Sequence, residues 1–101
     1  MLITDPPSVT VSPVSQEVAY QNSAILNCTS SGHPIPNITW SFGNENLNVE
    51  AKYNITIVGN VSTLIVKNLN RYDNGSYVCF AVNENGNDTN SSNLIVLSKY
   101  K

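Results

Sequence analysis

The chain has 101 residues, of which 41% are hydrophobic and 12% are charged, and its formal net charge is −2. This length fits one domain of common size with a single core. The five basic residues are scattered and form no stripe, which argues against nucleic acid or an anionic membrane as a partner. No apolar run approaches the roughly 20 residues that span a bilayer, so we expect no membrane insertion by this chain itself.

Short apolar alternations separated by turn residues run along the whole chain, without a helical period. This pattern predicts an all-β fold of seven or eight strands. We expect the strands to begin near residue 8, because Pro6 and Pro7 exclude a regular start, and to end near residue 97. The predicted strands cover residues 8–11, 14–20, 24–30, 37–42, 52–58, 61–67, 75–83 and 93–97.

The segments between these strands contain turn-forming residues. Pro13 interrupts the first pair of strands, which suits an edge strand that changes sheets. Residues 31–36 are predicted to form a rigid loop and residues 84–86 a hairpin turn. The turn-rich residues 43–51 leave open whether a further short strand is present. Residues 1–101 are predicted to form one domain, whose ends are linker or residues added for expression.

Cys28 and Cys79 are the only cysteines, and Trp40 lies between them in the sequence. A single disulfide that spans half of a chain, with a tryptophan placed to pack on it, is typical of a two-sheet β-sandwich. Both cysteines are then committed to the bridge, so neither thiol is available as a nucleophile.

Catalytic motifs are missing from the sequence. His33 is the only histidine and lies between Gly32 and Pro34 in a predicted exposed loop. The seven acidic residues show neither a paired motif nor the spacing of a calcium-binding loop, and no glycine-rich phosphate loop is present. We therefore expect no catalytic activity, no metal site and no cofactor.

Ordered motifs cover nearly the whole chain. They are Leu26-Asn27-Cys28, residues 32–40 ending at Trp40, residues 62–69, residues 73–79 ending at Cys79, Ala81-x-Asn83-x-x-Gly86 and Leu94-x-Val96. In this set and order, the chain resembles an immunoglobulin domain of the intermediate (I-set) kind found in adhesion molecules and receptor ectodomains. One departure is that Gln21-Asn22-Ser23 replaces the glycine usual before the second strand.

The resemblance implies an Ig-like two-sheet antiparallel Greek-key sandwich with an inter-sheet disulfide between Cys28 and Cys79. The hydroxyl of Tyr77 would bond to the backbone a few residues upstream. Asp73 would be a structural acid, with either Lys52 or Arg71 as its ion-pair partner. The core signature implied by the family comprises Trp40, Leu64, Leu69, Asp73, Gly75 and Tyr77.

Seven Asn-x-Ser/Thr sequons are present, whereas random order of 16 asparagines and 19 serines and threonines gives roughly three. An asparagine-rich genome would also produce extra sequons. Together with the paired cysteines, however, they predict an extracellular protein, secreted or on the cell surface, that carries N-linked glycans. The candidate sites are Asn27, Asn37, Asn54, Asn60, Asn74, Asn87 and Asn90. We expect occupancy of at least three, foremost Asn60, Asn87 or Asn90, because exposed turns admit the glycosyltransferase.

Alternation along the last two predicted strands places five apolar side chains on the outside of one sheet. We predict that they form one exposed patch, and such patches mark contacts. A neighbouring domain or an added edge strand would explain the same patch. The sequons would lie on the opposite sheet or at the two ends of the domain, which would leave this face free of sugar. The candidate binding face consists of Val78, Phe80, Val82, Ile95 and Leu97.

These observations predict a non-enzymatic extracellular recognition or adhesion module of a larger multi-domain protein. It would bind an unidentified protein, either another copy or a different partner, through this face. One alternative is a ligand-binding or spacer module of a receptor kinase or receptor phosphatase. Another is an intracellular spacer of the muscle I-set type, against which the cysteines and the sequons weigh.

Overall fold

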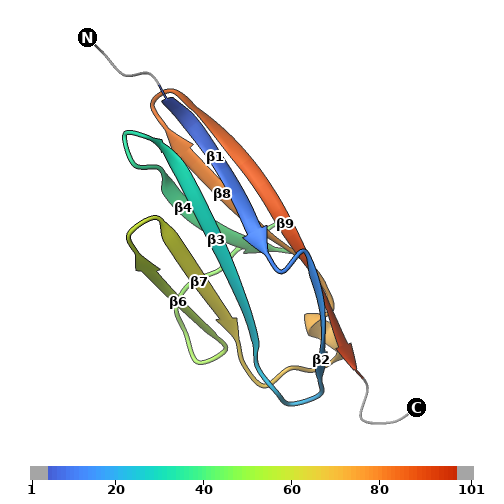
Figure 1. Ribbon diagram of the computed structural model, residues 1–101. Helices are drawn as coiled ribbons and strands as arrows, with labels where there is room; N and C mark the ends of the chain where they lie inside the picture. The colour runs from blue at the N-terminus through green and yellow to red at the C-terminus, as the bar shows by residue number, and fades with distance from the viewer. Residues whose placement is uncertain (1–4, 98–101) are drawn as a thin grey trace.

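The computed structural model describes residues 5–97, and the predicted end segments at 1–4 and 98–101 lie outside the described residues. Two sheets face each other, with strand orders β1-β3-β7-β6 and β2-β9-β8-β4-β5 (Figure 1). The elements are β1 (Asp5–Ser12), β2 (Ser15–Ala19), β3 (Ala24–His33), β4 (Asn37–Phe42), β5 (Glu45–Asn46), β6 (Tyr53–Val58), β7 (Val61–Val66), η1 (Arg71–Asp73), β8 (Gly75–Asn83) and β9 (Gly86–Leu97).

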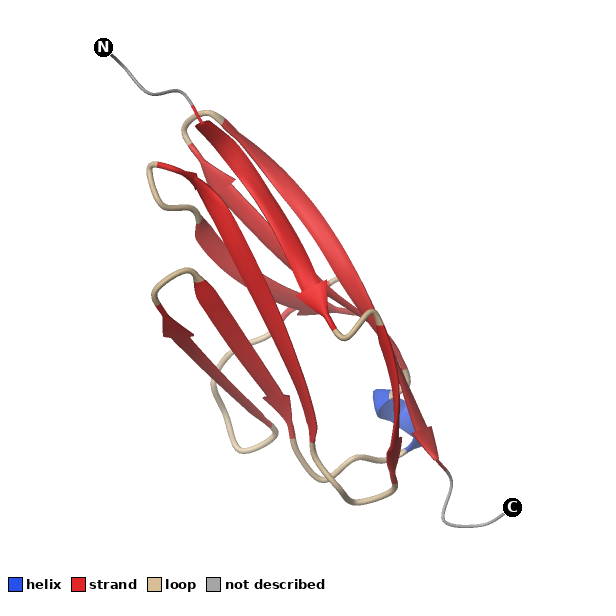
Figure 2. Ribbon diagram, viewed as in Figure 1, coloured by secondary structure: helices blue, strands red, loops and turns tan. Residues whose placement is uncertain are grey.

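The predicted all-β sandwich is confirmed, and Figure 2 shows one short helical turn, η1, within the described part of the chain. Strands β4 and β8 have the predicted bounds. The chain changes sheets at Pro13 as predicted, because β1 pairs with β3 whereas β2 pairs in parallel with β9. The open question about residues 43–51 is resolved by β5, which pairs with the end of β4.

The predicted start of the first strand near residue 8 is wrong, because β1 begins at Asp5 and includes Pro6 and Pro7. Proline lacks the N–H that a ladder needs, but an edge strand tolerates it where the ladder is irregular. Strand β1 is such an edge strand, and its pairing with β3 shifts register between Asp5 and Ser8. The predicted loop at 31–36 is also too long, since β3 continues to His33.

The last strand is much longer than predicted, because β9 begins at Gly86 rather than at residue 93. Polar residues on its inner row concealed it, and their side chains bond to the backbone of the N-terminal segment. The Asp88 carboxylate accepts the N–H of Val9 at 2.9 Å, and the Asn90 amide donates to the carbonyl of Val9 at 3.2 Å. The Ser92 hydroxyl donates to the carbonyl of Pro13 at 2.6 Å.

The centre of the core is the disulfide between Cys28 on β3 and Cys79 on β8, whose Cα atoms lie 6.4 Å apart. Trp40 on β4 is 1% exposed, and its indole N–H donates to the hydroxyl of Ser62 on β7 at 3.0 Å. Both contacts join the two sheets. The buried hydrophobic residues are Val9, Val11, Ala24, Leu26, Cys28, Trp40, Leu64, Val66, Leu69, Tyr77, Cys79, Ala81, Leu94 and Val96.

The segment leading into β8 is held by Tyr77 and Asp73. The Tyr77 hydroxyl donates to the carbonyl of Asp73 at 2.8 Å. The buried Asp73 carboxylate accepts the N–H of Asn70 at 2.9 Å and forms an ion pair with Lys52 at 2.7 Å. The ion-pair partner left open by the sequence is therefore Lys52, whereas Arg71 contacts Tyr72.

Gly75 is required by a close approach. Its φ of +144° lies in the region that favours glycine, and a Cβ there would lie 2.9 Å from the Phe42 ring. The Phe42 ring stacks on the Tyr77 ring, with centroids 4.3 Å apart. A side chain at this position would therefore displace the stacked pair.

Replacing Tyr77 with phenylalanine tests this corner. Burial, followed by the nearby charge of Asp73, raises the pKa of Tyr77. The neutral phenol is therefore favoured in the folded state, and this stability is present below pH about 10 and lost as the pH rises further. We expect Tyr77→Phe to lower the free energy of unfolding by about 1–2 kcal/mol at neutral pH, because the Asp73 carbonyl loses its donor.

Denaturant unfolding at neutral and alkaline pH measures both effects. The stability lost above pH about 10 should be smaller in Tyr77→Phe than in the parent. Exposed Tyr72 provides the matched control, since Tyr72→Phe should leave both quantities nearly unchanged. Equal alkaline loss in the parent and in Tyr77→Phe would contradict this account of the corner.

Candidate interaction face and glycosylation sites

The five residues of the predicted binding face all project from the outer side of the five-stranded sheet, but they form two groups. Val78, Phe80 and Val82 follow one another on β8 and make an outer stripe, the name used for these three residues below. Ile95 and Leu97 lie on β9 where it pairs with β2. The residue of β9 opposite Val78 is Ser91, so Ile95 lies about 13 Å farther along the strand. The prediction of one continuous patch is therefore wrong.

The outer stripe is apolar, but both of its neighbouring strands are polar. Val82, in the middle of this arrangement, is 37% exposed, and Val78 and Phe80 are half-buried. The register gives each stripe residue one polar neighbour on β4 and another on β9. These neighbours are Ser41 and Ser91 for Val78, Thr39 and Thr89 for Phe80, and Asn37 and Asn87 for Val82.

Two sequons therefore lie on the face that was predicted to be free of sugar. Asn37 and Asn87 are paired with Val82 from opposite sides, and residues directly opposite each other project to the same face. Both asparagines are exposed. The prediction failed because β9 is longer than its sequence indicated, which moves Asn87 from a turn into the sheet.

The remaining sequons differ in what their side-chain amides contact. The amide nitrogens of Asn60, Asn74 and Asn90 donate to the backbone carbonyls of Ser30, Arg71 and Val9, respectively. The Asn27 oxygen accepts the hydroxyl of Thr63 on β7, and half-buried Asn54 lies on β6. Among residues 5–97, no comparable hydrogen bond holds the amide of Asn37 or Asn87, so these two nitrogens are directed to solvent.

A shallow depression of about 520 Å³ lies beside the outer stripe, on the side of β4 and β5. It contains Val78 and Phe80 as its apolar floor, and hydroxyl and amide groups surround them. The lining residues are Thr39, Ser41, Asn44, Asn46, Val78, Phe80 and Thr89. A surface of this composition fits an occupant with apolar faces and many hydroxyl groups.

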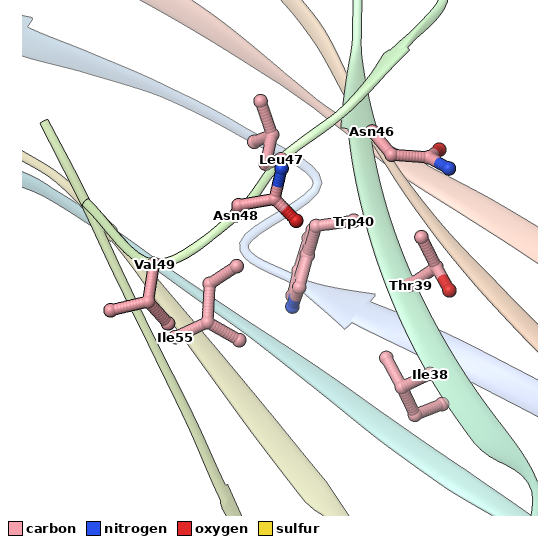
Figure 3. Close-up of a pocket in the computed structure, with 8 residues that line it drawn as sticks. All are labelled: Ile38, Thr39, Trp40, Asn46, Leu47, Asn48, Val49 and Ile55. Atoms are coloured by element: carbon pink, nitrogen blue, oxygen red, sulfur yellow. The ribbon is translucent and has the colours of Figure 1, made fainter.

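A second hollow, of about 430 Å³, opens at the edge of the sandwich between β4 and β6. Figure 3 shows the Trp40 ring between Ile38 on one side and Val49 and Ile55 on the other. None of its eight lining side chains is acidic or basic. The hollow therefore offers apolar contact but no group that could transfer a proton.

Two further properties bear on the chemistry of the surface. Within residues 5–97, His, Cys, Asp and Glu side chains form no group of three or more that could hold a metal ion. The same residues contain no helix that is long and apolar enough to cross a membrane.

Comparison with known proteins identifies the family. The model of the immunoglobulin I-set domain matches residues 7–96. Cell adhesion molecule DSCAM of Homo sapiens is 30% identical over 97 residues, which cover 91% of this chain and 5% of DSCAM. Muscle M-line assembly protein unc-89 of Caenorhabditis elegans is 40% identical over 72 residues, which cover 71% of this chain and 1% of unc-89. Peroxidasin homolog of Mus musculus is 37% identical over 78 residues, covering 76% of this chain and 5% of that protein.

Solved structures agree with this assignment. An I-band fragment of titin containing I67–I69 matches with a TM-score of 0.84 and 34% identity over 90% of this chain and 32% of that chain. The titin M10 and obscurin-like 1 Ig complex matches with a TM-score of 0.85 and 27% identity over 91% of this chain and 93% of that chain. The chain spans only a small part of the curated relatives, so it corresponds to one module of such proteins. It belongs to the immunoglobulin I-set domain family.

Proposed function

We propose that the chain is a non-enzymatic extracellular module for recognition or adhesion within a larger multi-domain protein. The observation that carries this proposal is the fully buried disulfide between Cys28 and Cys79. Structural disulfides persist in oxidising compartments and are rare in the cytosol. Five of the seven sequon asparagines are exposed, which supports the same compartment.

The protein-binding surface of this proposal is the outer stripe with the depression beside it. Phe80 lies in the middle of the stripe and on the floor of the depression. Central aromatic residues supply much of the binding free energy of protein interfaces. The similarity to cell adhesion molecule DSCAM supports a role of this kind.

An intracellular mechanical spacer is the second candidate. The similarity to unc-89 and to titin domains favours it. A module of a receptor kinase or phosphatase ectodomain is a variant of the first proposal, in which the domain binds ligand or separates other domains. The state of the cysteines and sequons in the natural protein distinguishes the extracellular proposals from the intracellular one.

Peptide mapping of the protein isolated from the cells that make it provides that test. We expect a disulfide-linked peptide containing Cys28 and Cys79, and sugar on at least three sequons after comparison with glycosidase-treated material. Exposed Asn37 and Asn87 should be among them, because their amides hold no backbone group. Free thiols together with unmodified asparagines would support the intracellular spacer instead.

Substitution of Phe80 tests the proposed binding surface, with a domain produced without glycans because two sequons adjoin the stripe. Phe80→Ala and Val82→Asp should each weaken self-association or partner binding at least tenfold, because a central anchor contributes about 2 kcal/mol. Sedimentation and binding titrations measure this effect. The melting temperature should change by only a few degrees, since both side chains project away from the core.

Thr10 provides the control, because it is exposed on β1 of the opposite sheet. Thr10→Ala should alter neither binding nor stability. If Phe80→Ala leaves binding intact in a stable domain, the partner site lies elsewhere. A large loss of thermal stability would mean that Phe80 contributes to the core rather than to a surface.

A further inference from the structure

The outer stripe and the two solvent-directed sequons occupy the same small area of one sheet. Directly opposed residues on neighbouring strands have Cβ atoms about 4.5–5.5 Å apart, and diagonal neighbours are about 7–8 Å apart. Asn37 and Asn87 are directly opposite Val82 and diagonal to Phe80. A sugar on either asparagine therefore starts within one residue's reach of the aromatic ring.

The chemistry of the stripe suits an N-acetylglucosamine residue. One face of a pyranose ring presents C–H groups, and these pack on the face of an aromatic ring such as Phe80. The hydroxyl and acetamido groups on its rim need hydrogen-bonding partners, and Thr39 and Thr89 lie on either side of Phe80. The adjoining depression adds two further polar groups, the amides of Asn44 and Asn46.

The amides also differ in a way that selects these two sites. Asn60, Asn74 and Asn90 use their nitrogen to hold backbone carbonyls, so a sugar there starts against the backbone. Asn74 uses its oxygen as well, which accepts the N–H of Val96 at 2.8 Å. Asn37 and Asn87 have no such role among residues 5–97, and their nitrogens are exposed beside the apolar stripe.

We propose that N-glycans attached to Asn37 and Asn87 pack their core N-acetylglucosamine residues on Val82 and Phe80. This inference deepens the proposed function and rests on passage of the protein through the secretory pathway. The sugars cover the apolar surface that would otherwise face water. Occupancy of the two sites then decides whether the outer stripe is covered by sugar or open to a protein partner.

Nuclear magnetic resonance of the secreted domain tests the packing directly. The domain is produced in human cells with labelled N-acetylglucosamine and high-mannose glycans, and then trimmed to one sugar per occupied site. The ring current of Phe80 should displace sugar proton resonances upfield from their positions in a free glycopeptide. The displaced resonances should disappear in Phe80→Leu and in the double variant Asn37→Gln/Asn87→Gln.

Asn54→Gln is the matched control, because it removes a strand sequon from β6 in the opposite sheet. The displaced resonances should persist in this variant. If Phe80→Leu does not fold, the comparison between the double variant and Asn54→Gln decides the result. Sugar resonances at free-glycopeptide positions, with both sites occupied, would overturn the inference, and so would a secreted domain in which both asparagines are unmodified.

These outcomes are separate from those that test the proposed function. The packing experiment uses a domain that is directed into the secretory pathway, so it reports on the sugars whatever the natural compartment is. Free thiols and unmodified asparagines in the natural protein would contradict the extracellular proposal. Undisplaced sugar resonances on a correctly glycosylated domain would contradict only the packing of sugar on the stripe.

Discussion

The covalent bond between Cys28 and Cys79 is the constraint on which the rest of the structure depends. It joins β3 of one sheet to β8 of the other at the centre of the core. Trp40 packs in the same layer and adds a hydrogen bond to Ser62 on β7. Two sheets of a small domain would otherwise be held mainly by apolar contact, which gives little preference for one alignment over another. The bridge and the indole hydrogen bond fix that alignment.

The alignment of the sheets determines what each face presents to solvent. Once Cys79 faces inward, its neighbours Val78 and Phe80 on β8 must face outward, because side chains alternate along a strand. Pairing with β4 and β9 then brings Asn37 and Asn87 beside Val82. The proposed sugar-packing site is therefore a consequence of the same register that the core imposes. A shift of one residue in β8 would bury the stripe and expose Tyr77.

Much of the fold could be predicted from the sequence, because its core residues alternate regularly and its motifs are ordered. Trp40, Leu64, Leu69 and Tyr77 are buried as the resemblance implied. The start of β9 could not be predicted in the same way. Its inner row contains Asp88, Asn90 and Ser92, and these polar side chains are satisfied by backbone groups some 80 residues away in sequence. No local pattern reveals such partners.

The candidate site was predicted in part, and the reasons differ between its residues. The outward direction of Phe80 followed from alternation, whereas the separation of Ile95 and Leu97 from the stripe depends on the pairing register of β8 with β9. The position of Asn37 could have been found by counting back from Trp40, since both lie on β4. Lys52 is separated from Asp73 by 21 residues, and only the fold distinguishes it from Arg71.

Equilibrium unfolding of the oxidised and the reduced domain tests the central role of the bridge most directly. The closed loop of about 50 residues predicts that reduction lowers the free energy of unfolding by about 4 kcal/mol. Intact mass after alkylation verifies the state of the cysteines in each sample. An equal free energy of unfolding for both forms would contradict the account, because noncovalent contacts alone would then suffice to align the sheets.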